Sequence, residues 1–413
     1  MKIGNVFARE VLDSRGNPTV EAEVAGKGVL ARAIAPSGAS TGTHEAHELR
    51  DGGKRFLGKG VLNAVSNVNK IIAPGIRGME AEAQGEIDAR MMALDGTPNK
   101  SSLGANATVA VSMAAMKAAA MGQGKAVYQY LGGNSLPVPM LNILNGGKHA
   151  GNALAIQEFM IMPKWPKTFK AALQMASETY HALGTRLSKK YGPSARNVGD
   201  EGGFAPNLPD CFSAMEEISL AIEEAGYGNE LKLGVDAAAS SFYDQRSGKY
   251  LIDGKKLGAG ALMDYYGEMI KKYGVLSIED PFHEEDFAGF AAMTAKFGPR
   301  VQIVGDDLLV TNPERLKTAI SKKSVNALLL KINQIGTVSE SMEVARMCRK
   351  NGIRIVVSHR SGESEDSFIA DFAVGIEAGQ IKTGAPARGE RTAKYNQLLR
   401  IEEDPEVSIA RVF

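Results

Sequence analysis

Cysteine and net charge are scarce in this chain of 413 residues. It has only two cysteines, Cys211 and Cys348, and its 48 basic side chains are almost balanced by 47 acidic ones. So few cysteines argue against a disulfide framework and favour a reducing compartment such as the cytoplasm. The near-neutral charge argues against general nucleic-acid binding and against polybasic attachment to a membrane.

Long apolar runs and nucleotide-binding loops are missing as well. No stretch reaches the ~18 uninterrupted apolar residues of a membrane helix. The first residues, "MKIGNVFAREVLDSRGNP", break up any signal-peptide core with charges and turns. We find no Gly-x-Gly-x-x-Gly that opens a helix and no Gly-Lys-Ser/Thr loop. The sequence therefore predicts a cytoplasmic protein without a membrane span, and it disfavours nucleotide binding.

Two different patterns meet near "YLGGNSLPVP". Before it, residues 1–60 alternate polar and apolar side chains, as in "TVEAEVAG", and residues 61–131 become helical, as in "ANATVAVSMAAMKAAAMG". Strands followed by helices predict a smaller N-terminal α+β domain over residues 1–131. After it, short apolar runs alternate with amphipathic helical segments, which predicts a parallel sheet. With about eight strand candidates, an α/β fold closed into a β/α (TIM-like) barrel over residues 132–413 is favoured.

Charged side chains stand at the ends of the apolar runs in this second region. The runs "LGVD", "LSIED", "QIVGDD", "LLLK", "VVSHRS" and "QIKTG" end on or beside Asp236, Glu279, Asp306, Lys331, Arg360 and Lys382. The carboxyl ends of barrel strands form the active-site face. We therefore expect these six side chains to meet at one mouth of the barrel.

The six side chains suit a metal ion and an anion together. Three carboxylates from successive strands, with neither cysteine nor a close histidine pair, favour Mg²⁺ over softer metals. The three cations on the other strands suit a substrate with more than one negative charge, and Arg360 offers a fork for phosphate or carboxylate. The pattern predicts a site that holds metal and anion at once.

Lys331 allows two interpretations, because a buried ammonium has to be paired or discharged. Beside a metal ion and other cations its pKa would fall, and a neutral Lys331 near neutral pH would be a competent general base. A structural ion pair with a barrel carboxylate is the alternative. The local sequence leaves both open.

Taken together, several segments resemble the enolase family. In family order, from about residue 3 to residue 403, they are "LDSRGNPTVEAEV", "PSGASTG", "GGKHAGNALAIQEFM", "NVGDEGGFAPN", "SIEDPF", "GDDLLVTNP", "LLLKINQIGT", "SHRSGESED" and "GQIKTGAPARGERTAKYNQLLRIEE". The resemblance implies a barrel of the enolase kind and a hydro-lyase of glycolysis and gluconeogenesis. The reaction would be reversible dehydration of 2-phospho-D-glycerate to phosphoenolpyruvate, with two Mg²⁺ ions per active site.

The resemblance also implies roles for the residues that do chemistry. Lys331 would remove the proton at C2, and Glu201 would assist departure of the C3 hydroxyl, with Glu158 and His149 as further catalytic residues. The acid has to be protonated because hydroxide is a poor leaving group. We expect Glu158 and Asp200 to keep Glu201 neutral, since crowded carboxylates share a proton.

Metal and substrate ligands follow from the same motifs. Asp236, Glu279 and Asp306 would hold the first Mg²⁺, and Ser40 would hold the second. The substrate-binding residues would be His149, Gln157, Glu158, His359, Arg360, Ser361 and Lys382.

Two other functions compete with this interpretation. Another member of the superfamily would use one Mg²⁺ and a non-phosphorylated acid, but "SHRSGE" and "PSGASTG" suit phosphate and a second metal. A binding protein on the same scaffold would have lost Lys331, Glu201 or a metal carboxylate, and all of these are present. Arg15 lies in a segment that contacts the partner subunit in the family, so we expect a homodimer or a ring of dimers.

Overall fold

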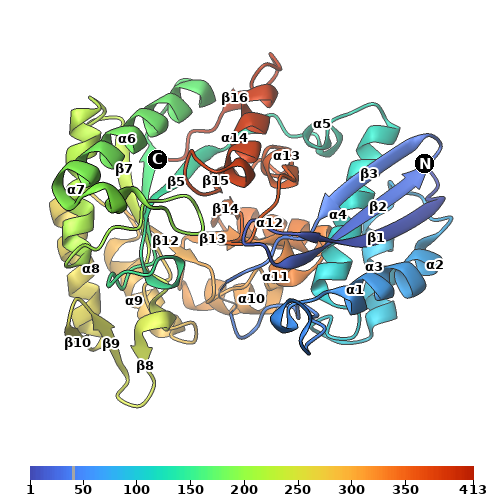
Figure 1. Cartoon of the computed structure of the whole chain (residues 1–413), viewed down its shortest axis with the longest axis horizontal. Coiled ribbons are helices and arrows are strands. Elements are labelled where there is room, and N and C mark those ends of the chain that lie inside the picture. Colours follow the sequence, from blue (N-terminus) through green and yellow to red (C-terminus); the bar gives the residue numbers. More distant parts are fainter. Residues whose placement is uncertain (40–41) are drawn as a thin grey trace.

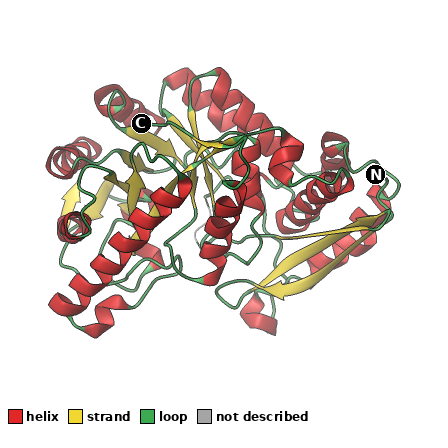
Figure 2. Ribbon diagram, turned by 90° about the horizontal axis from the view of Figure 1, so that it is seen from above, coloured by secondary structure: helices red, strands yellow, loops and turns green. Residues whose placement is uncertain are grey.

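The computed structural model describes residues 1–39 and 42–413. A smaller N-terminal α+β domain packs beside a large barrel that makes up the rest of the chain (Figures 1 and 2). The N-terminus lies at the outer end of the small domain, and the C-terminus lies on the barrel (Figure 1). The predicted fold class is confirmed.

The small domain begins with three antiparallel strands in the order β1-β2-β3. They are β1 (Asn5–Leu12), β2 (Pro18–Gly26) and β3 (Val29–Ile34). Lys27 and Gly28 join β2 to β3 with φ angles of 46° and 80°, the left-handed pair that a two-residue hairpin turn requires. The helices are α1 (Leu62–Asn67), α2 (Ala73–Ile76), α3 (Gln84–Asp95), α4 (Ala105–Gly122) and α5 (Val127–Leu131). The small side chains of α4 let it pack closely on β2 and β3, where it is almost wholly buried.

Eight strands close into the barrel in the order β11-β12-β13-β14-β15-β5-β6-β7. They are β5 (Val138–Asn145), β6 (Glu158–Pro163), β7 (Leu231–Asp236), β11 (Ser277–Glu279), β12 (Gln302–Gly305), β13 (Ala327–Leu330), β14 (Arg354–Ser358) and β15 (Gly379–Lys382). The minor strands are β4 (Ser135–Leu136), β8 (Tyr243–Asp244), β9 (Lys249–Ile252), β10 (Lys255–Leu257) and β16 (Ser408–Ile409).

Helices surround the barrel (Figure 2). They are α6 (Phe169–Tyr191), α7 (Cys211–Glu224), α8 (Ala259–Tyr273), α9 (Phe287–Phe297), α10 (Pro313–Lys322), α11 (Ile332–Ile335), α12 (Val338–Lys350), α13 (Phe368–Gly375) and α14 (Gly389–Ile401). Short 3₁₀ segments are Arg55–Gly58, Gly147–His149, Pro193–Arg196 and Ala239–Phe242, and Val68–Ile72 is a π-helical turn.

One strand contradicts the prediction of a wholly parallel sheet. β6 runs antiparallel to both of its neighbours, β5 and β7. Only residues 146–157 connect β5 to β6. A parallel arrangement needs a crossover connection of about a dozen residues or more, usually with a helix, so this connection is at the lower limit of the required length. Because β6 is reversed, its first residue, Glu158, lies at the same rim as the last residues of the other strands.

A small apolar cluster fills the barrel interior. Its members are Met140, Met160, Met162, Val304, Ala327, Leu329 and Val356. Leu329 belongs to this inner cluster, whereas Leu328 and Leu330 belong to the larger core outside the barrel. This is the alternation of a strand that is buried on both faces.

We expect Leu329→Ala to lower the free energy of unfolding by about 2–5 kcal/mol, because the closed interior cannot collapse around the lost side chain. Urea denaturation would measure it. Leu251→Ala on β9 is the matched control, since Leu251 is 44% exposed. Equal losses in the two variants would contradict the inner packing described here.

Candidate active site

Strand alternation aims the charged residues into the mouth of the barrel. Leu329 points inward, so Lys331, two residues on, continues along the same face. Val304 stands in the same relation to Asp306 on the neighbouring strand. On these two strands the inward row therefore has an apolar side chain in the interior and a charged one at the rim.

One buried cavity at this rim gathers most of the predicted residues. It is lined by His149, Gln157, Glu158, Glu201, Asp236, Asp306, Lys331, His359, Arg360, Ser361 and Lys382. Glu279 joins them through Lys382, its ion-pair partner. Ser40, the predicted ligand of a second metal, lies outside the described residues.

Lys382 stands among three carboxylates. Its Nζ lies 3.1 Å from Glu158 Oε2, 3.4 Å from Asp236 Oδ2 and 3.0 Å from Glu279 Oε1. Burial lowers the pKa of Lys382, but these carboxylates outweigh burial and hold the pKa well above its ordinary value. Burial, and then the charge of Asp236, raise the pKa of Glu279 well above its usual range. Around Lys382, three carboxylates therefore share a single ammonium.

This crowding fits a divalent cation. Asp236, Glu279 and Asp306 are each less than 10% exposed, and buried carboxylates need cationic partners. Their ligand atoms are all oxygens, the donors that hard cations prefer. The carboxylates of Asp280, Asp306 and Asp307 also come within 4.8 Å of one another. Asp280 accepts hydrogen bonds from the backbone N–H groups of Asp306 and Asp307, so its carboxylate holds the turn that presents Asp306.

Lys331 forms an ion pair with Asp306, with 2.5 Å between Nζ and Oδ2. Burial is the largest single influence on the pKa of Lys331 and lowers it, but Asp306 and Glu279 act in the opposite direction, and the net direction is upward. A carboxylate charge lies directly against the ammonium, and it opposes the lowering of the pKa that a metal ion and the neighbouring cations would cause. The structural ion pair that the sequence left open is present.

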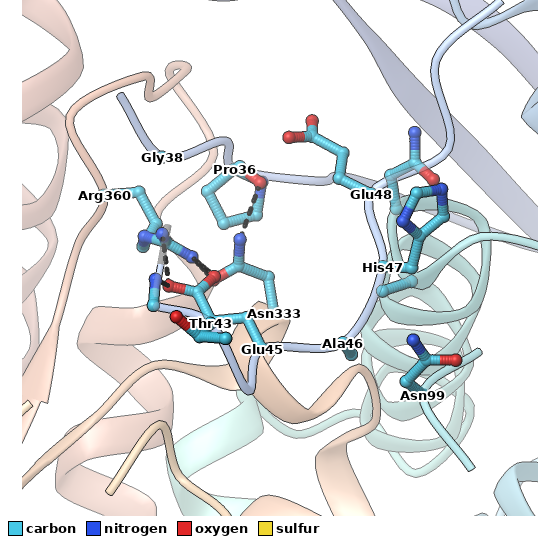
Figure 3. Close-up of a pocket in the computed structure, with 13 residues that line it drawn as sticks. Pro36, Gly38, Thr43, Glu45, Ala46, His47, Glu48, Asn99, Asn333 and Arg360 are labelled. Carbon is cyan, nitrogen blue, oxygen red and sulfur yellow. Dashed lines mark hydrogen bonds and ion pairs between the residues drawn. The ribbon is translucent and has the colours of Figure 1, made fainter. Parts of the chain in front are cut away.

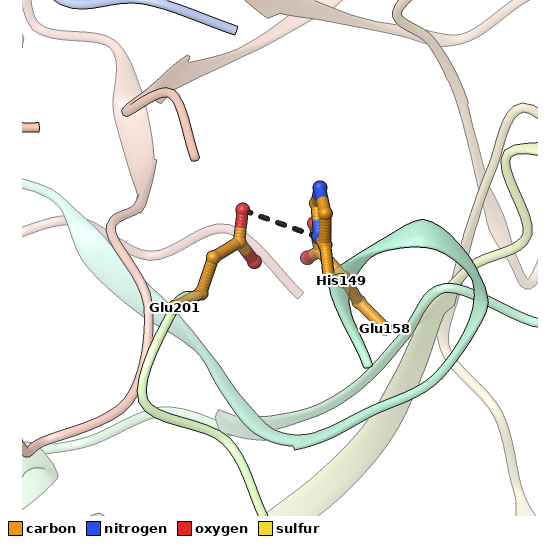
Figure 4. A group of neighbouring side chains, drawn as sticks. All are labelled: His149, Glu158 and Glu201. Carbon is orange, nitrogen blue, oxygen red and sulfur yellow. Dashed lines mark ion pairs between the residues drawn. The ribbon is translucent and has the colours of Figure 1, made fainter. Parts of the chain in front are cut away.

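A second carboxylate pair faces His149. Nδ1 of His149 lies 3.5 Å from Glu201 Oε1 and 3.8 Å from Glu158 Oε1 (Figure 4). Burial and the neighbouring Glu201 raise the pKa of Glu158 to about 8. Burial also raises the pKa of Glu201, but His149 and His359 outweigh it, so the pKa falls well below the usual range.

The pKa values of the two carboxyls shift in opposite directions. That of Glu201 falls because two histidines face it, whereas the expectation was that crowded carboxylates keep Glu201 protonated. Asp200 does not contribute as expected, because it lies in a different groove with Arg15 and Arg388. Asn142, which the sequence reasoning missed, donates a hydrogen bond from Nδ2 to Glu201 Oε2 at 2.7 Å. Strand alternation could have identified Asn142, because it follows Met140, whose side chain points into the barrel, by two residues on β5.

Arg360, the predicted phosphate ligand, pairs with a residue of the small domain. It donates from Nη1 to Glu45 Oε2 at 2.9 Å and from Nη2 to Glu45 Oε1 at 3.1 Å (Figure 3). Asn333 Oδ1 accepts a third hydrogen bond at 3.0 Å. The segment that carries Glu45 also reaches the barrel through Thr43, whose hydroxyl donates to Glu284. No local pattern could have found Glu45, because its role depends on how the two domains pack.

Two further predicted residues make polar contacts at the rim. The Ser361 hydroxyl accepts a hydrogen bond from Ala39 N at 2.6 Å and lies 3.5 Å from Nη1 of Arg15. Gln157 Nε2 lies 3.4 Å from Asp236 Oδ2. Arg15, which we expected at a subunit contact, thus also contacts the segment that carries Ser361.

Comparison with known proteins agrees with the geometry. The family model "Enolase, N-terminal domain" matches residues 3–131, and "Enolase, C-terminal TIM barrel domain" matches residues 133–409. An enolase from Thermococcus gammatolerans is 57% identical over 410 residues, covering 98% of this chain and 95% of that protein. Enolases from Methanocaldococcus jannaschii and Methanopyrus kandleri are 58% and 56% identical, with 98% of this chain covered in each case and 95% and 96% of those proteins.

Proposed function

The chain belongs to the enolase family of hydro-lyases, which dehydrate 2-phospho-D-glycerate to phosphoenolpyruvate, and from this premise we propose the role of each residue in the cavity. Lys331 is the base at C2, and Glu201 is the acid at the C3 hydroxyl. The observation that carries the proposal is that both lie in one buried cavity with Lys382 and Arg360. A cavity of this kind can hold a small polyanion between a base and an acid.

Anionic groups of the substrate meet the cations of the rim. Arg360 and Ser361 receive the phosphate, and Lys382 contacts the carboxylate. The guanidinium provides a planar fork for phosphate oxygens, and the ammonium provides a point charge. His149, Gln157 and His359 complete the wall of the cavity around the bound substrate.

The acid–base chemistry depends on charged side chains that already lie where negative charge develops on the substrate. A proton α to a carboxylate is very weakly acidic, and its removal adds negative charge to that carboxylate. Lys382 is already in place to meet this charge, so no reorganisation is needed. Lys331 accepts the C2 proton in its neutral form, and Glu201, once it has taken up the proton that it shares with Glu158, gives that proton to the departing hydroxyl. The Glu158 carboxyl, His149 and Asn142 surround Glu201 and set where that proton resides.

We propose Mg²⁺ as the divalent cation of this family site. Asp236, Glu279 and Asp306 would hold one ion, and Ser40 would be a ligand of a second. When bound, the metal supplies positive charge that stabilises the substrate carboxylate as it becomes more negative. The all-oxygen donor set supports Mg²⁺ over softer metals.

Ultraviolet absorbance of the conjugated product tests the proposed function. We expect absorbance to rise when 2-phosphoglycerate is added with Mg²⁺, to stay flat with a chelator, and to recover when excess Mg²⁺ is returned. A protein that turns over at full rate in the chelator would contradict the metal assignment. A flat trace in the metal-loaded protein would contradict the reaction itself.

The ion pair between Glu45 and Arg360 leads to a second prediction. Glu45 occupies the fork that phosphate has to share, so we expect Glu45→Gln to lower the KM for 2-phosphoglycerate about tenfold. This is the effect of removing a competing charged hydrogen-bond partner worth about 1.4 kcal/mol. Glu48→Gln is the matched control, because Glu48 pairs with Arg50 instead. An unchanged or higher KM in Glu45→Gln would contradict the competition.

Assembly and location belong to the same proposal. We propose a homodimer, supported by Arg15 and by Phe7 and Leu12, which are 44% and 57% exposed on the edge strand β1. Sedimentation equilibrium should give twice the mass of one chain. Cytoplasmic location is supported by Cys211 and Cys348, which are both buried and unpaired. Among the described residues, no helix is both long and apolar enough to cross a membrane.

The domain division is proposed as residues 1–131 and 132–413. The limits of the two family matches, 3–131 and 133–409, support it.

A further inference from the structure

Arg391 is a fully buried arginine in the first turn of α14, and none of the chemistry above uses it. Its guanidinium faces four acceptors. Nη1 lies 2.6 Å from His359 Nδ1 and donates to Arg360 O at 2.7 Å. Nη2 donates to Ser361 O at 2.6 Å and to Asp200 O at 3.0 Å. A buried charge with this many ordered partners has a defined position.

The contact with His359 fixes where the imidazole carries its proton. A guanidinium has donors only and does not lose its proton in proteins. The nitrogen that faces Arg391 must therefore accept, which leaves Nδ1 without a proton. A neutral ring then carries its single proton on Nε2. His359 Nε2 lies 3.5 Å from Glu201 Oε1, so the proton-bearing side of the ring faces the acid.

We propose that Arg391 is a positioning residue that holds His359 as its Nε2–H tautomer, directed at Glu201. The same guanidinium ties together the two segments on which the reaction depends. One carries His359, Arg360 and Ser361, and the other is the turn that carries Glu201. The role in turnover rests on the proposed function of Glu201, whereas the tautomer does not.

Neighbouring groups leave Arg391 little freedom to adopt another position. A Cβ on Gly384 would come within 2.8 Å of Arg391 Cδ, so the side chain packs directly on that backbone. Gly384 has a φ of 83°, in the left-handed region that glycine tolerates. Glu390 Oε1 lies 3.4 Å from Arg391 Nε and balances its charge.

Solid-state NMR of the full-length protein would read the tautomer directly. Histidine labelled with ¹⁵N at Nδ1 alone is incorporated, and the signal of His359 is identified among the six histidines by its loss in His359→Asn. We expect an unprotonated, pyridine-type Nδ1 signal in the wild-type protein at neutral pH. A protonated, pyrrole-type signal there would overturn the proposal before any Arg391 variant is made.

Variants of Arg391 separate this role from general packing. In Arg391→Met the signal should gain a pyrrole-type fraction, and kcat should fall about 10- to 100-fold, the usual effect of losing a group that orients a site residue. Arg391→Lys keeps a donor and should keep the pyridine-type signal, with part of the activity restored. Arg388→Met is the matched control, because Arg388 donates to Gly199 O and Ser14 O and does not touch His359.

Each outcome decides the proposal. A folded Arg391→Met with an unchanged Nδ1 signal would overturn it, and so would a pyrrole-type signal in Arg391→Lys. If Arg391→Met does not fold, the wild-type and Arg391→Lys signals still decide. Failure of the proposed role of Glu201 would appear separately, as normal turnover in Glu201→Gln with no change in the His359 signal.

Discussion

Lys331→Ala is expected to lower kcat for dehydration about 10²- to 10⁴-fold, the range for loss of a positioned general base. Lys331 lies inside the cavity at the end of β13, where it forms an ion pair with Asp306. Alanine leaves no group there that can accept the C2 proton. The initial rate of phosphoenolpyruvate formation at saturating substrate and Mg²⁺ would measure the loss.

Lys148→Ala is the matched control for this variant. Lys148 immediately precedes His149 but is exposed, so its loss removes one cation near the site without entering the cavity. Its kcat should stay close to that of the wild-type protein. Activity of Lys331→Ala within about threefold of wild type would fall far outside the range for a lost base, and it would leave Lys331 as a purely structural partner of Asp306.

Glu201→Gln should lower kcat to a similar extent, about 10²- to 10⁴-fold, for a different reason. The amide has nearly the same shape and keeps an oxygen for the hydrogen bond that Asn142 donates. However, an amide cannot give a proton to the departing hydroxyl. Substrate affinity should change little, because the phosphate and carboxylate ligands are untouched.

Asp200→Asn provides the control for Glu201→Gln. Asp200 is the adjacent residue on the same turn, but its side chain lies in the neighbouring groove with Arg15 and Arg388. A loss in Asp200→Asn as large as that in Glu201→Gln would mean that the turn as a whole is sensitive, and the acid would then have to be sought elsewhere.

Sequence patterns located the site because the end of each apolar run can be recognised locally, and the fold of a barrel then brings these strand ends to one face. Asp236, Lys331 and Lys382 each stand at the end of an apolar run, and all parallel strands of a barrel end at the same rim. The rim residues of six different strands could therefore be placed together without any tertiary information. Glu158 was reached only through the family motif, because it stands at the start of a strand whose reversed direction the pattern did not reveal.

Contacts between distant segments could not be predicted in this way. Glu45 meets Arg360 only because the small domain packs on the barrel, and the two residues are separated by 315 positions. Arg391 stands on a helix whose local sequence offers no sign of a buried guanidinium.

Charge states were the least predictable feature. The expected protonation of Glu201 and discharge of Lys331 both depended on nearest neighbours that sequence spacing does not reveal. In the structure these neighbours are two histidines beside Glu201 and a carboxylate beside Lys331.

Exchange of the C2 proton tests the division of labour between Lys331 and Glu201 most directly. 2-Phosphoglycerate is incubated with Mg²⁺ in deuterated water, and loss of its C2 proton signal is followed by NMR. We expect Glu201→Gln to exchange the C2 proton while forming almost no product, because the base is intact and the acid is absent. Lys331→Ala should neither exchange nor form product. Exchange by Lys331→Ala at the rate of Glu201→Gln would contradict the account, since the base would then be another group.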